Sequence, residues 1–318
     1  MTYPSLDDVR TAHKRILPYI HKTPVLSSTL INRMFDSEIY LKCENFQKIG
    51  AFKFRGATNA ILQLDDKAKR NGVITHSSGN HAAAVTLAAV SAGVKAYIVM
   101  PENAPVVKKN AVAGYGAEIT FCTPTLKARE DTTAEIIDRT GATLIHSYDD
   151  FNVICGQGTA GLELMEEKPD LDIVIVPVGG GGLMSGVSTA VKGISGKTKV
   201  IGAEPLNAND AYKSFVSGTL VPSVNPRTIA DGLLTSLSDM TFSIIKRNVD
   251  NIYTVSEKSI ISAMRLIWER MKIIVEPSSA TTLAVFLENP KLFRGKSAGL
   301  IITGGNVDLA SLPFNGDS

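Results

Sequence analysis

A short apolar run that ends in four consecutive glycines constrains the fold of this chain more than any other feature. The run, Asp172–Val178, has no polar alternation, which is typical of a strand buried on both faces of a sheet. It leads into Gly179–Gly182 and then into Leu183–Ile194, which has the pattern of a helix. A buried strand, a tight turn and a helix form the repeating unit of α/β proteins.

The alternation of strand and helix continues from about residue 38 onward, and no repeat or low-complexity tract interrupts it. Alternation of this kind predicts an α/β fold with parallel sheets covered by helices. The predicted strands are Ile39–Leu41, Val73–Thr75, Ala96–Val99, Glu118–Phe121, Thr143–Ile145, Asp172–Val178, Lys199–Ala203 and Ala298–Ile302. The predicted helices are Asn59–Arg70, His81–Ser91, Val106–Ala113, Leu126–Thr140, Thr159–Glu167 and Leu183–Ile194.

Composition excludes several classes of protein. The length of 318 residues allows about two domains of roughly 150 residues each. With 33 Lys and Arg against 31 Asp and Glu, the chain lacks the basic excess of a dedicated nucleic-acid binder. No apolar run approaches the roughly 20 residues that span a bilayer, so we expect no membrane partner. Three cysteines without metal-ligand spacing predict neither a disulfide framework nor a zinc site, and favour a cytoplasmic protein.

Glycine-rich or polar loops follow four of the predicted strands. They contain Ser77–His81, Gly179–Gly182, Glu204-Pro205 and Thr303–Asn306. In open α/β sheets, ligands bind beyond the carboxyl ends of the strands, so we expect these loops to gather at one rim. The four glycines expose consecutive N–H groups at a helix start, which suits an anion such as phosphate. The alternative is a flexible turn, but four glycines cost backbone entropy that a mere turn does not require.

Two further motifs carry polar chemistry and remain ambiguous when each is taken alone. The Ser77–His81 segment offers hydroxyls, an amide and free N–H groups that could bind a carboxylate, or it is simply a helix N-cap. Lys53 lies between Phe52 and Phe54. An apolar pocket would lower the pKa of its amine and suit it to Schiff-base chemistry. The alternative is a surface lysine with its charged end in solvent.

Together these motifs resemble the fold-type II pyridoxal-phosphate enzymes, and within them the serine racemase and serine/threonine dehydratase group. The resemblance runs from Thr23 to Asp308 and implies a tryptophan synthase β-like fold with two parallel-rich open sheets flanked by helices. It further implies a large domain of residues 1–71 and 149–318, and a small mobile domain of residues 72–148. The matching segments are Lys42–Gln47, Gly50–Ala57, Ser77–His81, Gly156–Thr159, Gly179–Leu183, Thr228–Gly232, Val275–Pro277 and Thr303–Asp308.

The resemblance assigns a set of cofactor contacts. Lys53 would hold pyridoxal phosphate as a Schiff base and would then remove the substrate α-proton. Phe52 would pack beside the ring, Asn80 would hydrogen-bond the ring 3′ oxygen, and Gly179–Gly182 would bind the phosphate. Thr303 would meet the pyridine nitrogen, where the family usually has serine. A hydroxyl at this position, in place of a carboxylate, favours early loss of a β-leaving group.

The resemblance also assigns contacts to a small amino-acid substrate. Ser77, Asn80 and His81 would bind its carboxylate. Ser78 would lie on the ring face opposite Lys53 and act as the second acid/base, the one that serves the D-enantiomer. Arg129 falls where the family has an arginine on the mobile domain, although its local sequence context matches poorly.

A divalent cation, Mg²⁺ or Ca²⁺, is a second implied ligand. Glu204 and Asp210 are carboxylates six residues apart, and such hard oxygen atoms suit either ion. The resemblance adds the carbonyl of Ala208 and completes the site with water. Read without the resemblance, the segment is a polar turn.

The resemblance raises two questions of assembly and regulation. It implies a homodimer. Some racemases of the group are also activated by ATP at a subunit interface, and Tyr115, Lys108 and Asn306 match such positions. Ala83 stands where a glutamine is expected, which weakens the prediction of an ATP effector.

Several functions fit these motifs. The leading one is a serine racemase, or an L-serine/L-threonine dehydratase that releases water and then ammonia to give a 2-oxo acid. An L-threo-3-hydroxyaspartate dehydratase is an alternative. A second alternative is a β-replacement transferase of the cysteine-synthase type, which usually has Lys-Asp-Arg where this chain has Lys53-Phe54-Arg55. A third is a non-catalytic ligand-binding α/β protein.

Overall fold

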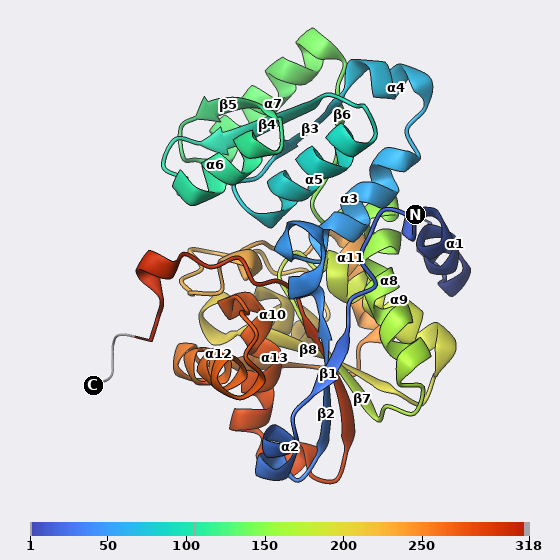
Figure 1. Cartoon of the computed structure of the whole chain (residues 1–318), viewed down its shortest axis with the longest axis vertical. Helices are drawn as coiled ribbons and strands as arrows, with labels where there is room; N and C mark the ends of the chain where they lie inside the picture. The colour runs from blue at the N-terminus through green and yellow to red at the C-terminus, as the bar shows by residue number, and fades with distance from the viewer. Residues whose placement is uncertain (1, 105, 315–318) are drawn as a thin grey trace.

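Two open sheets form the framework of the protein in the computed structural model, which describes residues 2–104 and 106–314 (Figure 1). The larger sheet has the strand order β1-β2-β10-β7-β8-β9, and the smaller has the order β5-β4-β3-β6. Every paired strand runs parallel to its neighbour except β1, which is antiparallel to β2. The predicted α/β class with two parallel-rich sheets is confirmed.

The larger sheet is built from both ends of the chain. Its strands are β1 (Val25–Ser27), β2 (Glu38–Cys43), β7 (Ile173–Pro177), β8 (Lys199–Pro205), β9 (Asn251–Val255) and β10 (Ser297–Ile302). The helices of this part are α1 (Leu6–Ile16), α2 (Thr29–Phe35), α8 (Phe151–Glu167), α9 (Gly182–Ile194), α10 (Asp210–Ser217), α11 (Asp239–Asn248), α12 (Glu257–Met271), α13 (Pro277–Glu288) and α14 (Pro290–Phe293).

The smaller sheet comes from one continuous stretch of chain. It contains β3 (Val73–His76), β4 (Ala96–Pro101), β5 (Glu118–Cys122) and β6 (Thr143–Leu144). The helices of this stretch are α5 (Asn80–Ser91), α6 (Val106–Gly114) and α7 (Leu126–Thr140). Helices α3 (Lys53–Leu62) and α4 (Asp66–Asn71) lead into it from the larger sheet (Figure 1).

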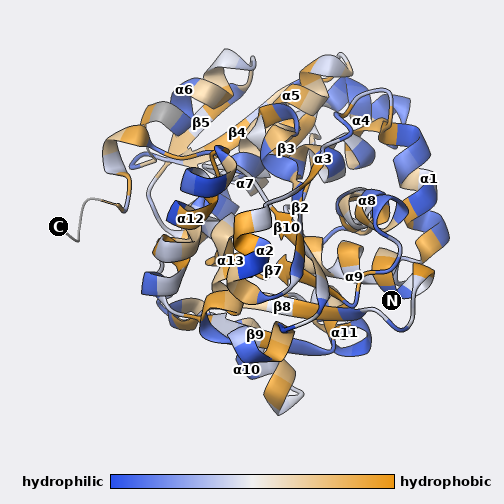
Figure 2. Ribbon diagram, turned by 60° about the horizontal axis from the view of Figure 1, so that its bottom comes forward, coloured by the Kyte–Doolittle hydropathy of each residue, from blue (hydrophilic) through white to orange (hydrophobic). Residues whose placement is uncertain are grey.

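Alternating side chains on each buried strand serve two separate cores. Ile173 and Ile175 of β7 face the core beneath α12 and α13, whereas Val174 and Val176 face α8 and α9. In the smaller sheet, Val73 faces α5 while the next residue in the strand faces α7. Helices on both faces explain why these strands lack polar alternation. Figure 2 shows the apolar central strands of the larger sheet enclosed by helices of mixed polarity.

The strand order places a crevice at the end of each sheet where the loops gather. In the larger sheet the chain moves outward from β7 to β9 and then returns with β10 on the other side of β7. A similar reversal separates β3 from β6 in the smaller sheet. Ligands of open α/β sheets bind beyond the carboxyl ends of strands at such reversals. The loops at the two reversals are 77–79, 145–150, 178–181 and 303–305.

Three sequence predictions differ from the structure. The helix predicted over Asn59–Arg70 is two helices, because α3 already begins at Lys53 and Asp65 caps the start of α4 by accepting from the N–H of Ala68. The helix predicted over Thr159–Glu167 begins earlier, at Phe151, where Asp150 is the N-cap. Strands β1 and β9 are absent from the sequence prediction.

Candidate active site

Lys53 is the first residue of α3 and directs its amine toward the loop after β6. Its Nζ donates a hydrogen bond to the carbonyl oxygen of Ser147 at 2.8 Å and lies 5.2 Å from the ring centroid of Phe52. Burial lowers the pKa of Lys53 to about 8, and the nearby carboxylate of Glu276 limits that fall. Near neutral pH the amine therefore exchanges its proton more readily than a surface lysine does.

A buried ionic network anchors the helix turn that carries this lysine. Arg55 donates from Nε to Glu44 at 2.6 Å and from Nη1 to Glu163 at 2.8 Å. Lys42 donates to the other oxygen of Glu163 at 2.6 Å. Two positive and two negative groups thus pair within the core, and none of them is more than 1% exposed. Such a network is stable only when every charge is partnered, so it fixes the start of α3 relative to β2 and α8.

The four glycines form the turn between β7 and α9. Gly181 has a φ of +85° and is the N-cap of α9, so the free N–H groups of the first helical turn face the crevice. A Cβ on Gly180 would lie 2.3 Å from Cδ1 of Tyr148. A Cβ on Gly182 would lie 2.8 Å from the Cα of the same tyrosine. Close packing, and not only the exposure of N–H groups, therefore requires glycine here.

The other two glycines are constrained from a different side. A Cβ on Gly179 would lie 3.0 Å from the Cα of Leu233. A Cβ on Gly181 would lie 2.8 Å from side-chain atoms of both Leu237 and Thr241. The loop is therefore packed between two segments of the chain and is not a flexible turn, which favours the predicted anion cradle.

Asn80 begins α5 and connects the two sheets through a buried carboxylate. Its Nδ2 lies 3.0 and 3.2 Å from the two oxygens of Glu276, and its Oδ1 accepts from Nδ2 of Asn306 at 2.8 Å. Glu276 is only 4% exposed, and burial raises its pKa to about 7. In the sequence Glu276 is only part of a matching segment, and the prediction gives it no role.

Thr303 follows β10 and lies beside the lysine. Its carbonyl oxygen accepts from the N–H of Phe52 at 2.9 Å, and its hydroxyl shares a 2.9 Å hydrogen bond with the hydroxyl of Ser279. Ser279 also accepts from the N–H of Gly304 at 2.9 Å. These bonds hold the Thr303 hydroxyl next to the start of α3. The sequence prediction misses Ser279, because it lies inside a helix with no local motif.

The Ser77–His81 segment occupies the turn from β3 into α5. Ser77 accepts from the N–H of Gly79 at 3.3 Å, and Ser77, Ser78 and Asn80 are all partly buried. The ring of His81 is turned into the core, where Nε2 donates to the carbonyl of Ile145 at 2.9 Å. Burial, reinforced by the charge of Lys53, lowers the pKa of His81 to about 3, so the ring is neutral.

Arg129 lies in the first turn of α7 and is partly buried. Its charge helps to lower the pKa of His76, the last residue of β3, although burial is the larger cause. Arg129 therefore approaches the loop that begins at Ser77.

The two carboxylates of the predicted cation site come together at the end of β8. Glu204 is 1% exposed and accepts from the N–H groups of Ala211 and Tyr212 at 2.8 and 2.7 Å. Asp210 is 4% exposed, and its Oδ2 has no hydrogen-bond partner among the described residues. Burial raises the pKa of both groups, that of Glu204 to about 8. Ala208 is buried in the short turn between them. A buried, unpartnered carboxylate oxygen beside a second carboxylate fits a hard cation.

The positions matched to an ATP site have other partners in this structure. Lys108 forms an ion pair with Asp231, and Asn306 donates to Asn80 and to the carbonyl of Ile49. Tyr115 packs against the core around α5, in which Ala83 is buried. ATP as an effector stays a prediction.

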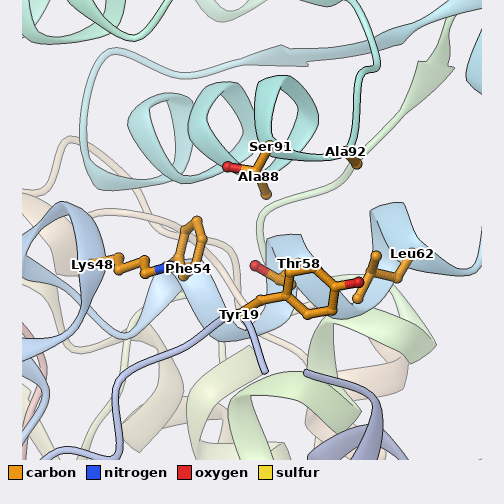
Figure 3. A pocket seen from close by; sticks show the side chains of 8 residues that line it. All are labelled: Tyr19, Lys48, Phe54, Thr58, Leu62, Ala88, Ser91 and Ala92. Atoms are coloured by element: carbon orange, nitrogen blue, oxygen red, sulfur yellow. The ribbon is translucent and has the colours of Figure 1, made fainter. Parts of the chain in front are cut away.

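A pocket between α3 and α5 is separate from these groups (Figure 3). The side chain of Phe54 points toward this pocket, together with Lys48, whose Nζ lies 5.6 Å from the Phe54 ring centroid. None of its lining residues is a predicted site residue. They are Tyr19, Lys48, Phe54, Thr58, Leu62, Ala88, Ser91 and Ala92.

Replacing Glu276 by glutamine is expected to change how stability depends on pH. Burial raises the pKa of Glu276 from 4.5 to about 7 in the folded protein. The folded state therefore binds this proton more tightly, and its stabilising effect is lost as the pH rises from about 4.5 to about 7. In cofactor-free protein, the stability of Glu276→Gln relative to the wild type should increase over that range by about 3 kcal/mol. Urea unfolding at pH 5 and pH 8 measures the change, and a constant difference would contradict it.

Two features are absent from the part of the chain that the structure describes. Within residues 2–104 and 106–314, no helix combines the length and hydropathy needed to cross a bilayer. The same residues contain no cluster of three or more His, Cys, Asp or Glu side chains able to bind a metal ion. The Glu204–Asp210 pair has two such side chains and needs the backbone carbonyl as well.

Comparison with known proteins agrees with this geometry. A family model described as pyridoxal-phosphate dependent enzyme matches residues 16–304. The chain is 52% identical to a serine racemase of Dictyostelium discoideum over 97% of this chain and 96% of that protein. It is 47% identical to a beta-hydroxyaspartate dehydratase of Paracoccus denitrificans, covering 99% and 100% respectively. A solved threonine deaminase from the organism abbreviated T.th. superimposes with a TM-score of 0.93 at 43% identity, covering 97% and 100%. On the match over residues 16–304 and these identities, the chain belongs to the pyridoxal-phosphate dependent enzymes of fold-type II.

Proposed function

We propose that this enzyme acts on small β-hydroxy amino acids, as a serine racemase and as a dehydratase of L-serine or L-threonine. One observation carries the proposal. The Lys53 amine, the glycine loop, Asn80 and Thr303 all lie around the crevice where the strand order of both sheets reverses. Serine racemase and threonine deaminase relatives, at 52% and 43% identity, support the substrate class.

The residues of the crevice fit pyridoxal phosphate. Gly179–Gly182 and the N-terminus of α9 would hold the phosphate, since a Cβ at any of the four positions would meet neighbouring atoms within about 3 Å. Lys53 would bind the aldehyde carbon, and Phe52 would lie beside the ring. Asn80 would meet the ring oxygen, and the Thr303 hydroxyl would meet the ring nitrogen. When bound, the cofactor supplies an electron sink that acidifies the substrate α-carbon.

Lys53 is the base on one face of the substrate. The low pKa of its amine, about 8, leaves a useful fraction unprotonated near neutral pH, so Nζ can take the α-proton. Departure of the β-hydroxyl leaves an enamine, which hydrolyses to a 2-oxo acid and ammonia. Alternatively, a proton delivered to the opposite face by Ser78 gives the other enantiomer.

Substrate binding is assigned to the smaller sheet. Ser77, Ser78 and Asn80 present polar groups at the start of α5, where the helix dipole favours a carboxylate. His81, neutral and bonded to Ile145, positions this turn through its ring and leaves its backbone to face the carboxylate. Residues 72–148 would move as a small domain and bring Arg129 toward the substrate. Closure would exclude water from the reacting groups.

Magnesium or calcium is proposed at Glu204, Asp210 and the carbonyl of Ala208. Glu204 lies at the carboxyl end of β8, next to the strand that leads into the glycine loop. A cation would offset the cost of holding two buried carboxylates together. Its role is structural support, because neither carboxylate is among the groups around Lys53.

Removal of divalent cations is expected to lower the melting temperature by several degrees, because a ligand that binds only the folded state stabilises it. Adding Mg²⁺ or Ca²⁺ should restore the melting temperature of the wild type. Asp210→Asn should show no response to EDTA or to either ion. Asp170→Asn, an acidic residue in the loop before β7, is a control that should respond like the wild type. A full cation response in Asp210→Asn would overturn the site.

An L-threo-3-hydroxyaspartate dehydratase is the second candidate. Relatives with related names support it, including the Paracoccus denitrificans protein at 47% identity and an L-threo-3-hydroxyaspartate ammonia-lyase of Saccharomyces cerevisiae at 46%. A homodimer and a cytoplasmic location remain predictions of the same kind. A β-replacement transferase is less favoured, because the relatives named above are racemases, dehydratases and deaminases.

One substrate panel tests the proposal. The loaded enzyme is incubated with L-serine, D-serine, L-threonine and L-threo-3-hydroxyaspartate, each with Mg²⁺ or with EDTA. Formation of 2-oxo acid and the chirality of the remaining amino acid are followed separately. Turnover of L-serine with appearance of D-serine supports the first candidate, and exclusive turnover of 3-hydroxyaspartate supports the second. No turnover of any of the four would overturn both.

A further inference from the structure

A short segment after β6 touches both ends of the proposed cofactor site. The carbonyl of Ser147 accepts from the Lys53 amine at 2.8 Å. The next residue, Tyr148, has its ring against Gly180, where a Cβ would lie 2.3 to 2.5 Å from three ring atoms. The backbone of Tyr148 also lies against Gly182. The lysine and the phosphate loop are therefore separated by two consecutive residues of this segment.

Several contacts hold the segment in place. The ring of His146 packs edge-on against Tyr148, with centroids 4.7 Å apart. Nδ1 of His146 accepts from the N–H of Asp149 at 2.8 Å. Asp149 in turn accepts from the hydroxyl of Ser238, the N-cap of α11, at 2.6 Å. Tyr148 is only partly buried, so its ring borders the crevice and is not part of either core.

Filling of a core would not require this arrangement. A tyrosine that served only to pack would not need glycine beneath it, since alanine at position 180 would fill the same space. The chain instead has a glycine with no positive φ at 180, so the backbone conformation does not explain it. The ring occupies the volume that a side chain of residue 180 would take. This contact sets how closely the N–H groups of the loop approach the segment that receives Lys53.

We propose that Tyr148 is a positioning residue whose ring fixes the spacing between the glycine loop and the Lys53 amine. The inference rests on the proposed binding of pyridoxal phosphate at this site. A cofactor held at two ends binds tightly only when both anchors are at the correct separation, so loss of the ring lowers affinity through preorganisation. The ring, and not the hydroxyl, carries the effect.

The test measures affinity of the cofactor-free full chain for pyridoxal phosphate by titration of the visible absorbance. The variants are Tyr148→Phe, Tyr148→Leu, Tyr148→Ala, Gly180→Ala and the double variant Gly180→Ala/Tyr148→Ala. Gly196→Ala is the matched control, since a Cβ there meets no atom within 4 Å. Melting temperatures of the cofactor-free variants report damage to folding, and KM and kcat are measured on the loaded enzyme.

Tyr148→Phe and Gly196→Ala should keep the wild-type affinity within about threefold. Tyr148→Leu, Tyr148→Ala and Gly180→Ala should each weaken it by about 10-fold or more, equivalent to about 1.4 kcal/mol. The double variant should bind no more weakly than Gly180→Ala alone, because without the ring the added methyl has nothing to displace.

The inference is overturned if folded Tyr148→Leu binds the cofactor as tightly as the wild type. It is also overturned if the losses from Gly180→Ala and Tyr148→Ala add independently. A wild-type chain that binds no pyridoxal phosphate would overturn the proposed function as well, which separates the two failures. If Tyr148→Ala does not fold, the comparison of Tyr148→Leu with Tyr148→Phe decides.

Discussion

Lys53→Ala is expected to abolish the visible absorbance of bound cofactor and to lower kcat/KM by about 10³-fold or more. The reason is twofold, because the same amine forms the covalent bond to the cofactor and removes the α-proton. The phosphate loop and Asn80 remain in Lys53→Ala, so weak binding without the absorbance band should persist. Absorbance spectra of dialysed protein and the initial rate with L-serine measure both effects.

Lys48→Ala is the matched control for this result. Lys48 lies five residues earlier and also stacks near a phenylalanine ring, but its amine is directed to the pocket between α3 and α5. This variant should keep the absorbance band and most of the activity. A Lys53→Ala protein that retained the band would remove both Lys53 and the proposed chemistry.

Ser78→Ala is expected to separate the two faces of the reaction. With Lys53 intact, removal of the α-proton from L-serine and the loss of water should persist. Racemisation and any turnover of D-serine should fall by about 10²- to 10⁴-fold, the usual contribution of one positioned acid or base. Chiral analysis of serine and a 2-oxo acid assay on the same samples measure both.

Ser77→Ala serves as the comparison for Ser78→Ala. Ser77 is proposed to bind the carboxylate, so its loss should raise KM for both enantiomers alike. If Ser78→Ala instead loses L-serine dehydration and keeps D-serine dehydration, the assignment of the two faces is wrong.

Much of the fold could be predicted because its strands are buried on both faces. The strands β2 to β8 and β10 are continuous apolar runs or nearly so, and glycine or polar loops mark where most of them end. Local signals failed at short or partly exposed elements. β1 has three residues at the antiparallel edge, none of them buried. β9 is an edge strand with only two buried residues, Ile252 and Val255.

The candidate site divides in the same way. Lys53, Asn80 and the four glycines lie within compact motifs, so residue type and neighbours were enough to select them. Glu276, Ser279 and Tyr148 have no such motif. Glu276 is 196 residues from Asn80 and reaches it only because β3 and β10 end in facing crevices. Side-chain contacts over such separations depend on the order of strands, which no local pattern encodes.

The sequence by itself determined that the chain alternates strands and helices, that a lysine lies between aromatic residues, and that glycines follow a buried strand. These features are local, since they follow from the burial of each strand and the backbone freedom of each glycine. Only the tertiary structure decided why those glycines are required. Tyr148, Leu233, Leu237 and Thr241 pack onto the loop so closely that no Cβ fits. Close packing between distant segments is a property of the assembled fold, because it depends on where whole elements come to rest.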